Sequence, residues 1–160
     1  VRVDCELVMF LDGDGSDCPE FTAALLAPIE TGTHDFVIGS RTRGHREPGS
    51  MSPQQILAGY LVEFLCRMVY GITYTDMSPF RAIRRDQLIR LGLREPTYGW
   101  NLEMQMRAAG EGLRILEIPV DHRRRAGGSS KVSGNLIGSL RAAARILWTF
   151  FKIALAERKG

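Results

Sequence analysis

Apolar runs and amphipathic stretches alternate along the chain. The stretch Glu6–Leu11, apolar after its first residue, ends in a glycine-rich break and predicts a strand covered on both faces, as in a parallel sheet. Shorter apolar runs predict strands at 36–38, just before 84 and at 114–120. Periodic patterns between them predict helices from 19, 52–71, 86–93, from about 100, and 135–159. Strands that alternate with helices predict an α/β fold with a mainly parallel sheet flanked by helices.

Two helices carry specific expectations. Ser52 is a good N-cap, Pro53 suits a first turn and Gln55 can close a capping box. The apolar stripe of this helix is predicted to pack in the core, with no cofactor role: Leu57, Tyr60, Leu61, Phe64, Leu65 and Met68. On the helix from about 100, the side chains of Leu102, Met106 and Ala109 are predicted to pack while Glu103 faces elsewhere.

The last predicted helix, Asn135–Lys159, is amphipathic. At about 100° per residue, one stripe gathers cations and a tryptophan, and apolar residues lie roughly opposite. The stripe comprises Arg141, Arg145, Trp148, Lys152 and Lys159, and the other side Leu136, Ala143, Leu147, Phe150 and Ala154. Such a helix suits a membrane interface, and it suits packing on the protein's own core equally well.

Length and composition set the class of protein. The chain has 160 residues and a net charge of +3, which fits one globular domain. Three scattered cysteines without metal-ligand spacing favour a reducing compartment. No signal peptide opens the chain, and its apolar stretches are too short to span a bilayer. Because it lacks an initiating Met and enters a core strand almost at once, we expect an amino-terminal portion to precede it.

Two carboxylates follow the first predicted strand. Asp12 and Asp14 are two apart on an extended chain, so they point the same way and can share one cation. Ligands bind at the carboxyl ends of strands in open α/β sheets, and two carboxylates plus a substrate diphosphate suit Mg²⁺ or Mn²⁺. Asp-Gly-Asp-Gly is also good turn chemistry without a metal. An EF-hand is excluded, because the Glu that closes such a loop is missing.

Basic residues gather in separate loops. Arg41, Arg43 and Arg46 follow the second strand, and the segment 122–131 combines four cations with glycine and serine. Such donor-rich loops favour phosphate groups as partners, although a solvated basic loop has the same composition. Nucleic acid is not expected as a partner, because the cations lack interleaved aromatic residues on which bases stack.

Five motifs occur in the order seen in family 2 glycosyltransferases. They are Asp12-Gly13-Asp14 with Pro19-Glu20, Gly39-Ser40-Arg41, Asp76-Met77-Ser78-Pro79-Phe80-Arg81, Gly99-Trp100-Asn101-Leu102-Glu103, and Arg123-Arg124-Arg125 leading to Gly128-Ser129-Ser130-Lys131. Nearly the whole chain resembles the branch of dolichyl-phosphate mannose synthase and bacterial polyprenyl-phosphate glycosyltransferases. The resemblance implies a partial GT-A fold that lacks its amino-terminal donor-binding half. Residues 1–134 would be the C-terminal portion of the catalytic domain and 135–160 an interfacial helix.

The resemblance also implies an activity. The complete enzyme would transfer a sugar, with inversion and with Mg²⁺ or Mn²⁺, from a nucleotide-diphosphate donor to a polyprenyl phosphate or other phosphorylated acceptor. It would lie peripherally on the cytoplasmic face of the plasma membrane, held by the last helix. Because the donor-binding half is missing, the fragment alone is expected to be inactive.

Site residues follow by position in the motifs. Asp12 and Asp14 match the metal ligands, and Ser16, where mannose synthases often carry Gln, is the candidate third ligand. Ser40 and Arg41 match a pair near the acceptor phosphate. The loop that closes over the phosphates would supply Arg123, Arg125, Ser130 and Lys131. Of these residues, Asp14, Arg123 and Lys131 are the catalytic candidates, and the remaining substrate-binding candidates are Asp76, Ser78, Arg81 and Trp100.

The acceptor decides the role of Glu103. A lipid phosphate is already anionic and needs no strong base, so Glu103 would then only orient it, whereas a sugar hydroxyl would use Glu103 as its base. Two alternatives stay open at this point. One is a transferase that acts on a soluble hydroxyl acceptor, and the other is a non-catalytic module that binds anionic membranes.

Overall fold

The structure is a computed structural model that describes residues 5–97, 99–127 and 136–157. Its strands are β1 (Leu7–Phe10), β2 (Phe36–Ser40), β3 (Arg81–Arg84) and β4 (Ile115–Pro119). Its helices are the short 3-10 helix η1 (Pro19–Phe21), α1 (Thr22–Glu30), α2 (Pro53–Tyr70), α3 (Arg85–Leu91), α4 (Trp100–Gly110) and α5 (Leu136–Glu157). Every strand and helix that the sequence pattern predicts is present.

The four strands form one sheet in the order β1-β3-β2-β4. β2 and β4 pair in parallel, whereas β3 lies between β1 and β2 and is antiparallel to both. Three strands share one direction, but β3 is reversed, so two of the three neighbouring pairs in the described sheet are antiparallel. The sheet is therefore mixed and not mainly parallel as predicted. The reversal arises because residues 72–80 return the chain to the carboxyl end of β2, where the Gly39 amide donates to the Phe80 carbonyl oxygen (2.8 Å), before β3 begins.

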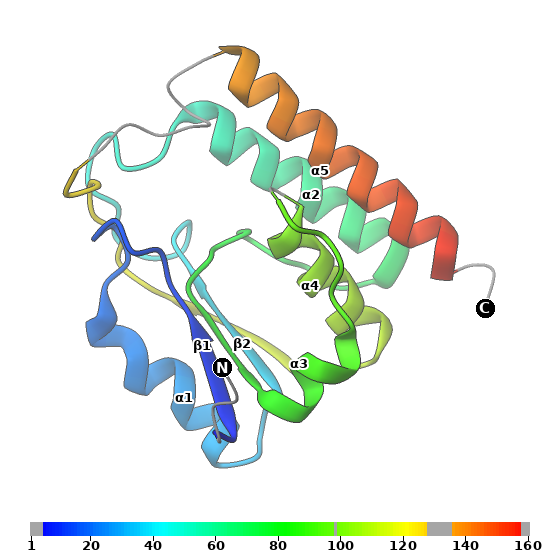
Figure 1. Ribbon diagram of the computed structural model, residues 1–160. Coiled ribbons are helices and arrows are strands. Elements are labelled where there is room, and N and C mark those ends of the chain that lie inside the picture. Colours follow the sequence, from blue (N-terminus) through cyan, green and yellow to red (C-terminus); the bar gives the residue numbers. More distant parts are fainter. Residues whose placement is uncertain (1–4, 98, 128–135, 158–160) are drawn as a thin grey trace.

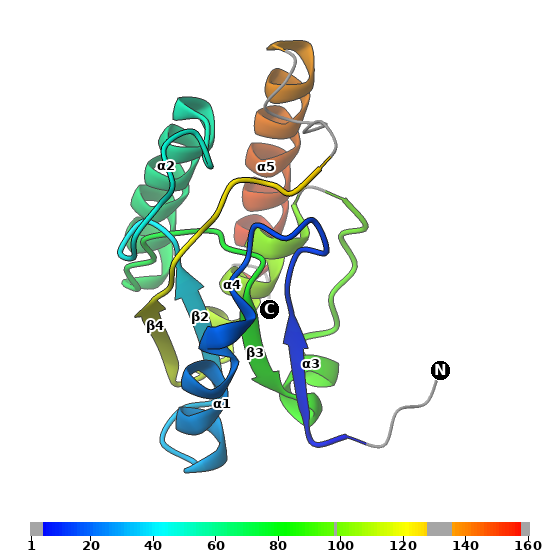
Figure 2. The same ribbon diagram turned by 90° about the vertical axis from the view of Figure 1, so that its left-hand side faces the viewer.

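Helices cover both faces of the sheet (Figure 1). α1 packs on one face through Leu25 and Ile29, against Val37 and Ala82. On the other face lies α4, with α2 and α5 forming the outermost layer (Figure 2).

β1 packs on both faces, as predicted: Val8 and Phe10 contact the core beneath α4, and Leu7 and Met9 contact the core beneath α1. It is only half-buried because it is an edge strand of the described sheet.

The capping box at Ser52 is present, but the predicted packing of α2 is wrong. The Ser52 hydroxyl accepts from the Gln55 amide and the Gln55 side chain accepts from the Ser52 amide, as expected. The side of α2 that packs inward carries Val62 and Cys66. Of the stripe assigned to the core, only Leu65 is half-buried, and its other members are exposed: Leu57, Tyr60, Leu61, Phe64 and Met68. Both sides of α2 are apolar, so periodicity alone cannot tell which one packs.

α5 lies with its apolar side inward. Phe150 and Ile153 join the core that contains Phe36 of β2, while Trp148 and Lys152 face outward. The helix thus packs on the protein's own core and still presents a basic, tryptophan-bearing surface. Among the described helices, none has the length and hydropathy needed to cross a bilayer.

We expect Ser52→Ala to lower the free energy of unfolding by about 1 kcal/mol, because the Gln55 amide loses its side-chain acceptor. Thermal unfolding should show a drop of roughly 2–4 °C. Gln54→Ala is the control, since Gln54 is exposed in the same helical turn. Equal melting temperatures for the two variants would contradict this assignment.

Candidate functional site

The acidic turn lies directly after β1 and is held by its own side chains. The Asp14 carboxylate accepts hydrogen bonds from the Ser16 amide (2.9 Å) and the Ser16 hydroxyl (2.6 Å). Burial opposes ionisation, but these hydrogen bonds and the charge of Arg125 hold the pKa of Asp14 below its usual value. Partial burial, and then the carboxylates of Asp17 and Asp14, raise the pKa of Asp12. Burial and two neighbouring carboxylates thus oppose the ionisation of Asp12, which a bound cation would favour.

A buried pair that the sequence analysis missed lies beneath this turn. Asp17 accepts from the Asp12 amide (2.8 Å) through one carboxylate oxygen, and its other oxygen lies 3.6 Å from Nδ1 of His122. Neither of these two facing atoms has a hydrogen-bond partner within the described residues. Asp17 thus fixes the backbone of Asp12. The sequence near Asp17 does not predict this role, because its contact is with His122, more than 100 residues later.

The basic segment 123–127 lies against the acidic turn. The Arg123 amide donates to the Ser16 carbonyl oxygen and the Ala126 amide to that of Asp14, both at 2.9 Å. Ion pairs join Arg125 to Asp14 (2.9 Å) and Arg123 to Glu20 (2.8 Å). The structure therefore brings Asp12, Asp14, Arg123 and Arg125 together. Ser130 and Lys131 lie outside the described residues.

On their other edge, His122, which precedes the basic segment, and Arg124 form hydrogen bonds with the loop after β2. The His122 amide donates to the His45 carbonyl oxygen (2.9 Å), and the His122 carbonyl oxygen accepts from the Glu47 amide (3.0 Å). The Arg124 amide donates to the Glu47 carboxylate (2.7 Å). The loop after β2 lies so close to the chain at Val120 that a Cβ at Gly44 would collide with the Val120 carbonyl oxygen. A pocket of about 390 Å³ opens in this loop, lined by residues 44–51 and Ile56.

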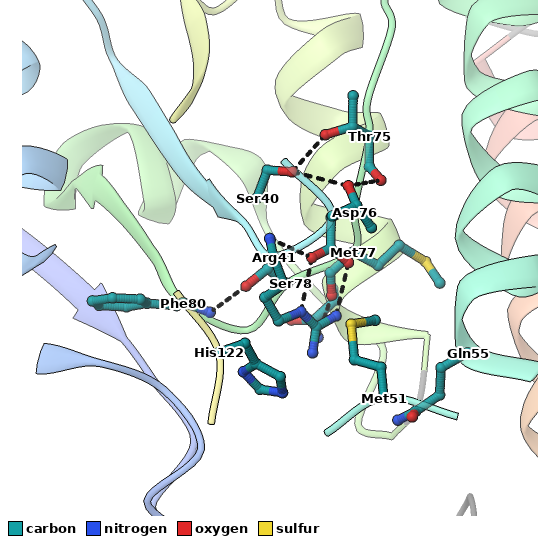
Figure 3. A network of polar contacts seen from close by, with 12 residues as sticks. Ser40, Arg41, Met51, Gln55, Thr75, Asp76, Met77, Ser78, Phe80 and His122 are labelled. Atoms are coloured by element: carbon teal, nitrogen blue, oxygen red, sulfur yellow. Dashed lines mark hydrogen bonds and ion pairs between the residues drawn. The ribbon is translucent and has the colours of Figure 1, made fainter. Parts of the chain in front are cut away.

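A polar network continues from the end of β2 (Figure 3). The Arg41 guanidinium forms a bidentate pair with Asp76, at 2.7 Å for both contacts, and the Arg41 amide adds a third hydrogen bond (2.9 Å). Both side chains are largely buried. The Ser40 hydroxyl lies 2.6 Å from that of Thr75. This network anchors residues 75–76 to the end of β2. Burial opposes the charged form of Arg41, but the charge and hydrogen bonds of Asp76, with smaller contributions from Asp17 and Asp12, raise the pKa of Arg41.

Of the other substrate-binding candidates, Ser78 and Arg81 are buried and Trp100 is half-buried. Arg81 is fully buried, donates to the carbonyl oxygens of Ser78 and Asn101, and lies 5.8 and 5.9 Å from the rings of Phe36 and Trp100. Burial lowers the pKa of Arg81 to about 9. Ser78 is buried as well, and Trp100 packs edge-on against Phe10 at 4.8 Å. In this arrangement these three residues join β3, α4 and β1, and Ser78 and Arg81 have no exposed surface to offer a ligand.

Glu103 is also buried, so the prediction that it faces away from the packed side of α4 is wrong. One carboxylate oxygen accepts from the amides of Arg94 (2.9 Å) and Glu95 (2.6 Å), and the other from Arg107 (2.9 Å). The chain before α4 folds back onto this side of the helix and is fixed by the carboxylate. Both oxygens are therefore engaged in holding the fold.

The donor set of the acidic turn fits a hard divalent cation that a substrate helps to bind. Asp12 and Asp14 supply carboxylate oxygens and Ser16 a hydroxyl. Within the described ranges, no three His, Cys, Asp or Glu side chains converge as a preformed metal site. Mg²⁺ is commonly bound by one or two carboxylates plus substrate phosphates rather than by a complete protein cage. The adjoining arginines are placed to contact those phosphates.

The chain has clear relatives, although no family model matches it. An uncharacterized glycosyltransferase of Mycobacterium tuberculosis is 34% identical over 135 residues, which are 84% of this chain and 60% of that protein. An undecaprenyl-phosphate mannosyltransferase of Micrococcus luteus is 32% identical over 141 residues, 83% of this chain and 56% of that protein. A polyprenol monophosphomannose synthase of Mycolicibacterium smegmatis is 28% identical over 141 residues, with 86% and 53% covered. The chain thus spans 53–60% of these relatives.

A solved structure has a similar fold. It is glucosyl-3-phosphoglycerate synthase from Mycobacterium tuberculosis in complex with phosphoglyceric acid, with a TM-score of 0.65. The match covers 94% of this chain and 50% of that chain at 21% sequence identity. At this identity the likeness concerns the fold alone.

We expect Asp76→Asn to lower the free energy of unfolding by about 3–5 kcal/mol, because it leaves the buried Arg41 guanidinium without a counter-charge. Urea denaturation measures this loss. Glu111→Gln is the matched control, because it breaks the exposed ion pair with Arg90 and should cost less than about 1 kcal/mol. Similar losses in both variants would show that the Arg41–Asp76 pair does not fix the site.

Proposed function

Since the chain is a homologue of glycosyltransferases and carries part of a GT-A fold, we propose that it belongs to an enzyme that glycosylates a polyprenyl phosphate. The donor would be a nucleotide-diphosphate sugar and the reaction a metal-dependent, inverting transfer. The observation that carries this proposal is the contact between the acidic turn and the basic segment, made by Asp14 with Arg125 and Ala126. The names of two relatives, which refer to undecaprenyl phosphate and polyprenol, support the lipid acceptor.

In this proposal the residues act by binding and by charge. Asp12 and Asp14, with the Ser16 hydroxyl, would hold Mg²⁺ or Mn²⁺, which when bound stabilises the negative charge that develops on the leaving diphosphate. Arg125, freed from Asp14 by the incoming cation, would turn to the phosphate oxygens together with Arg123. The acceptor phosphate would attack the anomeric carbon from the opposite side, near the end of β2. There Arg41 would have to exchange part of its pairing with Asp76 for the phosphate, while the buried Ser40 holds Thr75 in place.

The lipid acceptor is favoured over a sugar hydroxyl by the state of Glu103. A hydroxyl acceptor needs a base to take its proton, whereas a lipid phosphate is anionic already. The Glu103 carboxylate is buried and accepts three hydrogen bonds from backbone and arginine donors, which favours a role in holding the fold over that of a base. We further propose that the enzyme lies on the cytoplasmic face of the membrane, with α5 as its peripheral contact.

We expect Asp14→Ala and Arg125→Ala each to lower the transfer rate by roughly a hundredfold or more, because each removes a preorganised charge from the diphosphate site. The assay uses the full-length enzyme, labelled nucleotide sugars, a polyprenyl phosphate and Mg²⁺ or Mn²⁺. Glu111→Gln is the control, since Glu111 is an exposed residue outside the site. Unaltered turnover in either alanine variant would exclude the proposed site.

Glu103→Gln separates the two acceptor classes. We expect a stability loss of about 1–3 kcal/mol, because the amide cannot accept from all three donors that the carboxylate satisfies. Transfer to a polyprenyl phosphate, measured per folded molecule at low temperature, should change only a few-fold. If the rate instead fell a hundredfold without loss of stability, Glu103 would be a base and the acceptor a hydroxyl.

A further inference from the structure

α2 exposes a continuous apolar face. Five large side chains at helical spacing lie on it, each between 44% and 71% exposed: Leu57, Tyr60, Leu61, Phe64 and Met68. The opposite side of α2 is the one that packs, through Val62 and Cys66. Single exposed apolar residues are ordinary, but a stripe that runs along an 18-residue helix marks an interaction surface.

α5 extends this surface. It lies beside α2 in the outermost layer of the molecule, and both helices pack on α4 (Figures 1 and 2). Its outward residues include Trp148, Phe151 and Leu155, which are 54–64% exposed. We call these three residues and the five of the α2 stripe the α2–α5 surface.

The charges around the α2–α5 surface are positive. Arg67 of α2 and Arg141 and Lys152 of α5 are exposed, whereas the exposed Arg145 is paired with Glu95. The acidic residue of α2, Glu63, is half-buried and lies off the apolar stripe. Apolar side chains with a tryptophan, a tyrosine and flanking cations match the boundary between acyl chains and anionic headgroups, where aromatic rings and basic side chains both find suitable surroundings.

We infer that the α2–α5 surface lies in the interface of an anionic lipid bilayer. The side chains of α2 enter the acyl boundary, and Arg67, Arg141 and Lys152 face the lipid phosphates. Since no described helix can cross a bilayer, both helices lie along the surface of the membrane. The inference rests on the proposed function in its choice of partner, because an enzyme with a lipid acceptor must meet it at a membrane. It goes beyond that function in assigning the main apolar contact to α2.

The test is co-sedimentation of the 160-residue chain with two kinds of vesicle, pure phosphatidylcholine and phosphatidylcholine mixed with phosphatidylglycerol. Neither contains polyprenyl phosphate and no sugar donor is added, so the outcome is independent of transfer. We expect binding to the anionic vesicles, weakened by salt because part of the attraction is between charges. Phe64→Gln should reduce the partition coefficient at least about tenfold, because the variant no longer transfers a large apolar side chain from water into the lipid.

Ile89→Gln is the matched control. Ile89 is 62% exposed, close to the 59% of Phe64, but lies on α3, outside the α2–α5 surface. Its vesicle binding should stay within about twofold of the unmodified chain, and circular dichroism should show that both variants remain folded. No binding of the unmodified chain, or equal losses in the two variants, would overturn the inference.

Light scattering without lipid tests the alternative that a second copy of the chain covers the α2–α5 surface. If the unmodified chain is a dimer that Phe64→Gln dissociates, a second copy covers this face and the membrane assignment is wrong. A monomer that binds anionic vesicles supports it. A failure of the transfer assay alongside normal vesicle binding would reject the proposed reaction and leave the surface standing.

Discussion

Residues 120–126, which include the first part of the basic segment, form backbone hydrogen bonds along both edges. The geometry of the site depends on these hydrogen bonds. On one edge the amides of Arg123 and Ala126 donate to the acidic turn, and on the other His122 exchanges backbone hydrogen bonds with the loop after β2. Hydrogen bonds between backbone groups restrict the position of a loop more than contacts made by long, flexible side chains do. The acidic turn and the loop after β2, which lie far apart in the sequence, are therefore held on either side of residues 120–126. The buried contact between His122 and Asp17 adds a side-chain link to the acidic turn.

The balance of charge follows from this framework. Arg41 is neutralised by Asp76, and Asp14 is paired with Arg125. Among the described residues no cation contacts Asp12, and its carboxyl pKa is raised by burial and by neighbouring carboxylates. A divalent ion would remove this repulsion and at the same time release Arg125. In the proposed function, the arrangement would thus link cation binding to the availability of Arg125 for phosphate.

Local patterns predicted every strand and helix, because capping boxes, glycine breaks and apolar runs act over a few residues. The α/β class and the partial GT-A fold were correct, and the ordered motifs pointed to the turn and the basic segment that meet in the structure. The reversal of β3 and the burial of Glu103 were not predictable in this way. Both depend on where an irregular segment, 72–80 or 93–97, crosses back over the fold.

α2 shows a second limit of reading periodicity. Both of its sides are apolar, so the more hydrophobic stripe was assigned to the core although Val62 and Cys66 pack there. Which side of α2 packs is decided by its contact with α4, and the sequence pattern of α2 holds no information about that contact. Asp17 and His122 were missed for a similar reason, since their contact spans more than 100 residues and follows no motif.

We propose that a divalent ion joins the acidic turn to a pyrophosphoryl group beneath the basic segment. Paramagnetic broadening of backbone amide signals by Mn²⁺, added with inorganic pyrophosphate, measures it directly. We expect the signals of 12–17 and 122–127 to broaden together and those of α3, at the opposite end of the sheet, to stay sharp. The double variant Asp12→Asn with Asp14→Asn should abolish the effect. Broadening centred elsewhere, or confined to one of the two segments, would contradict it.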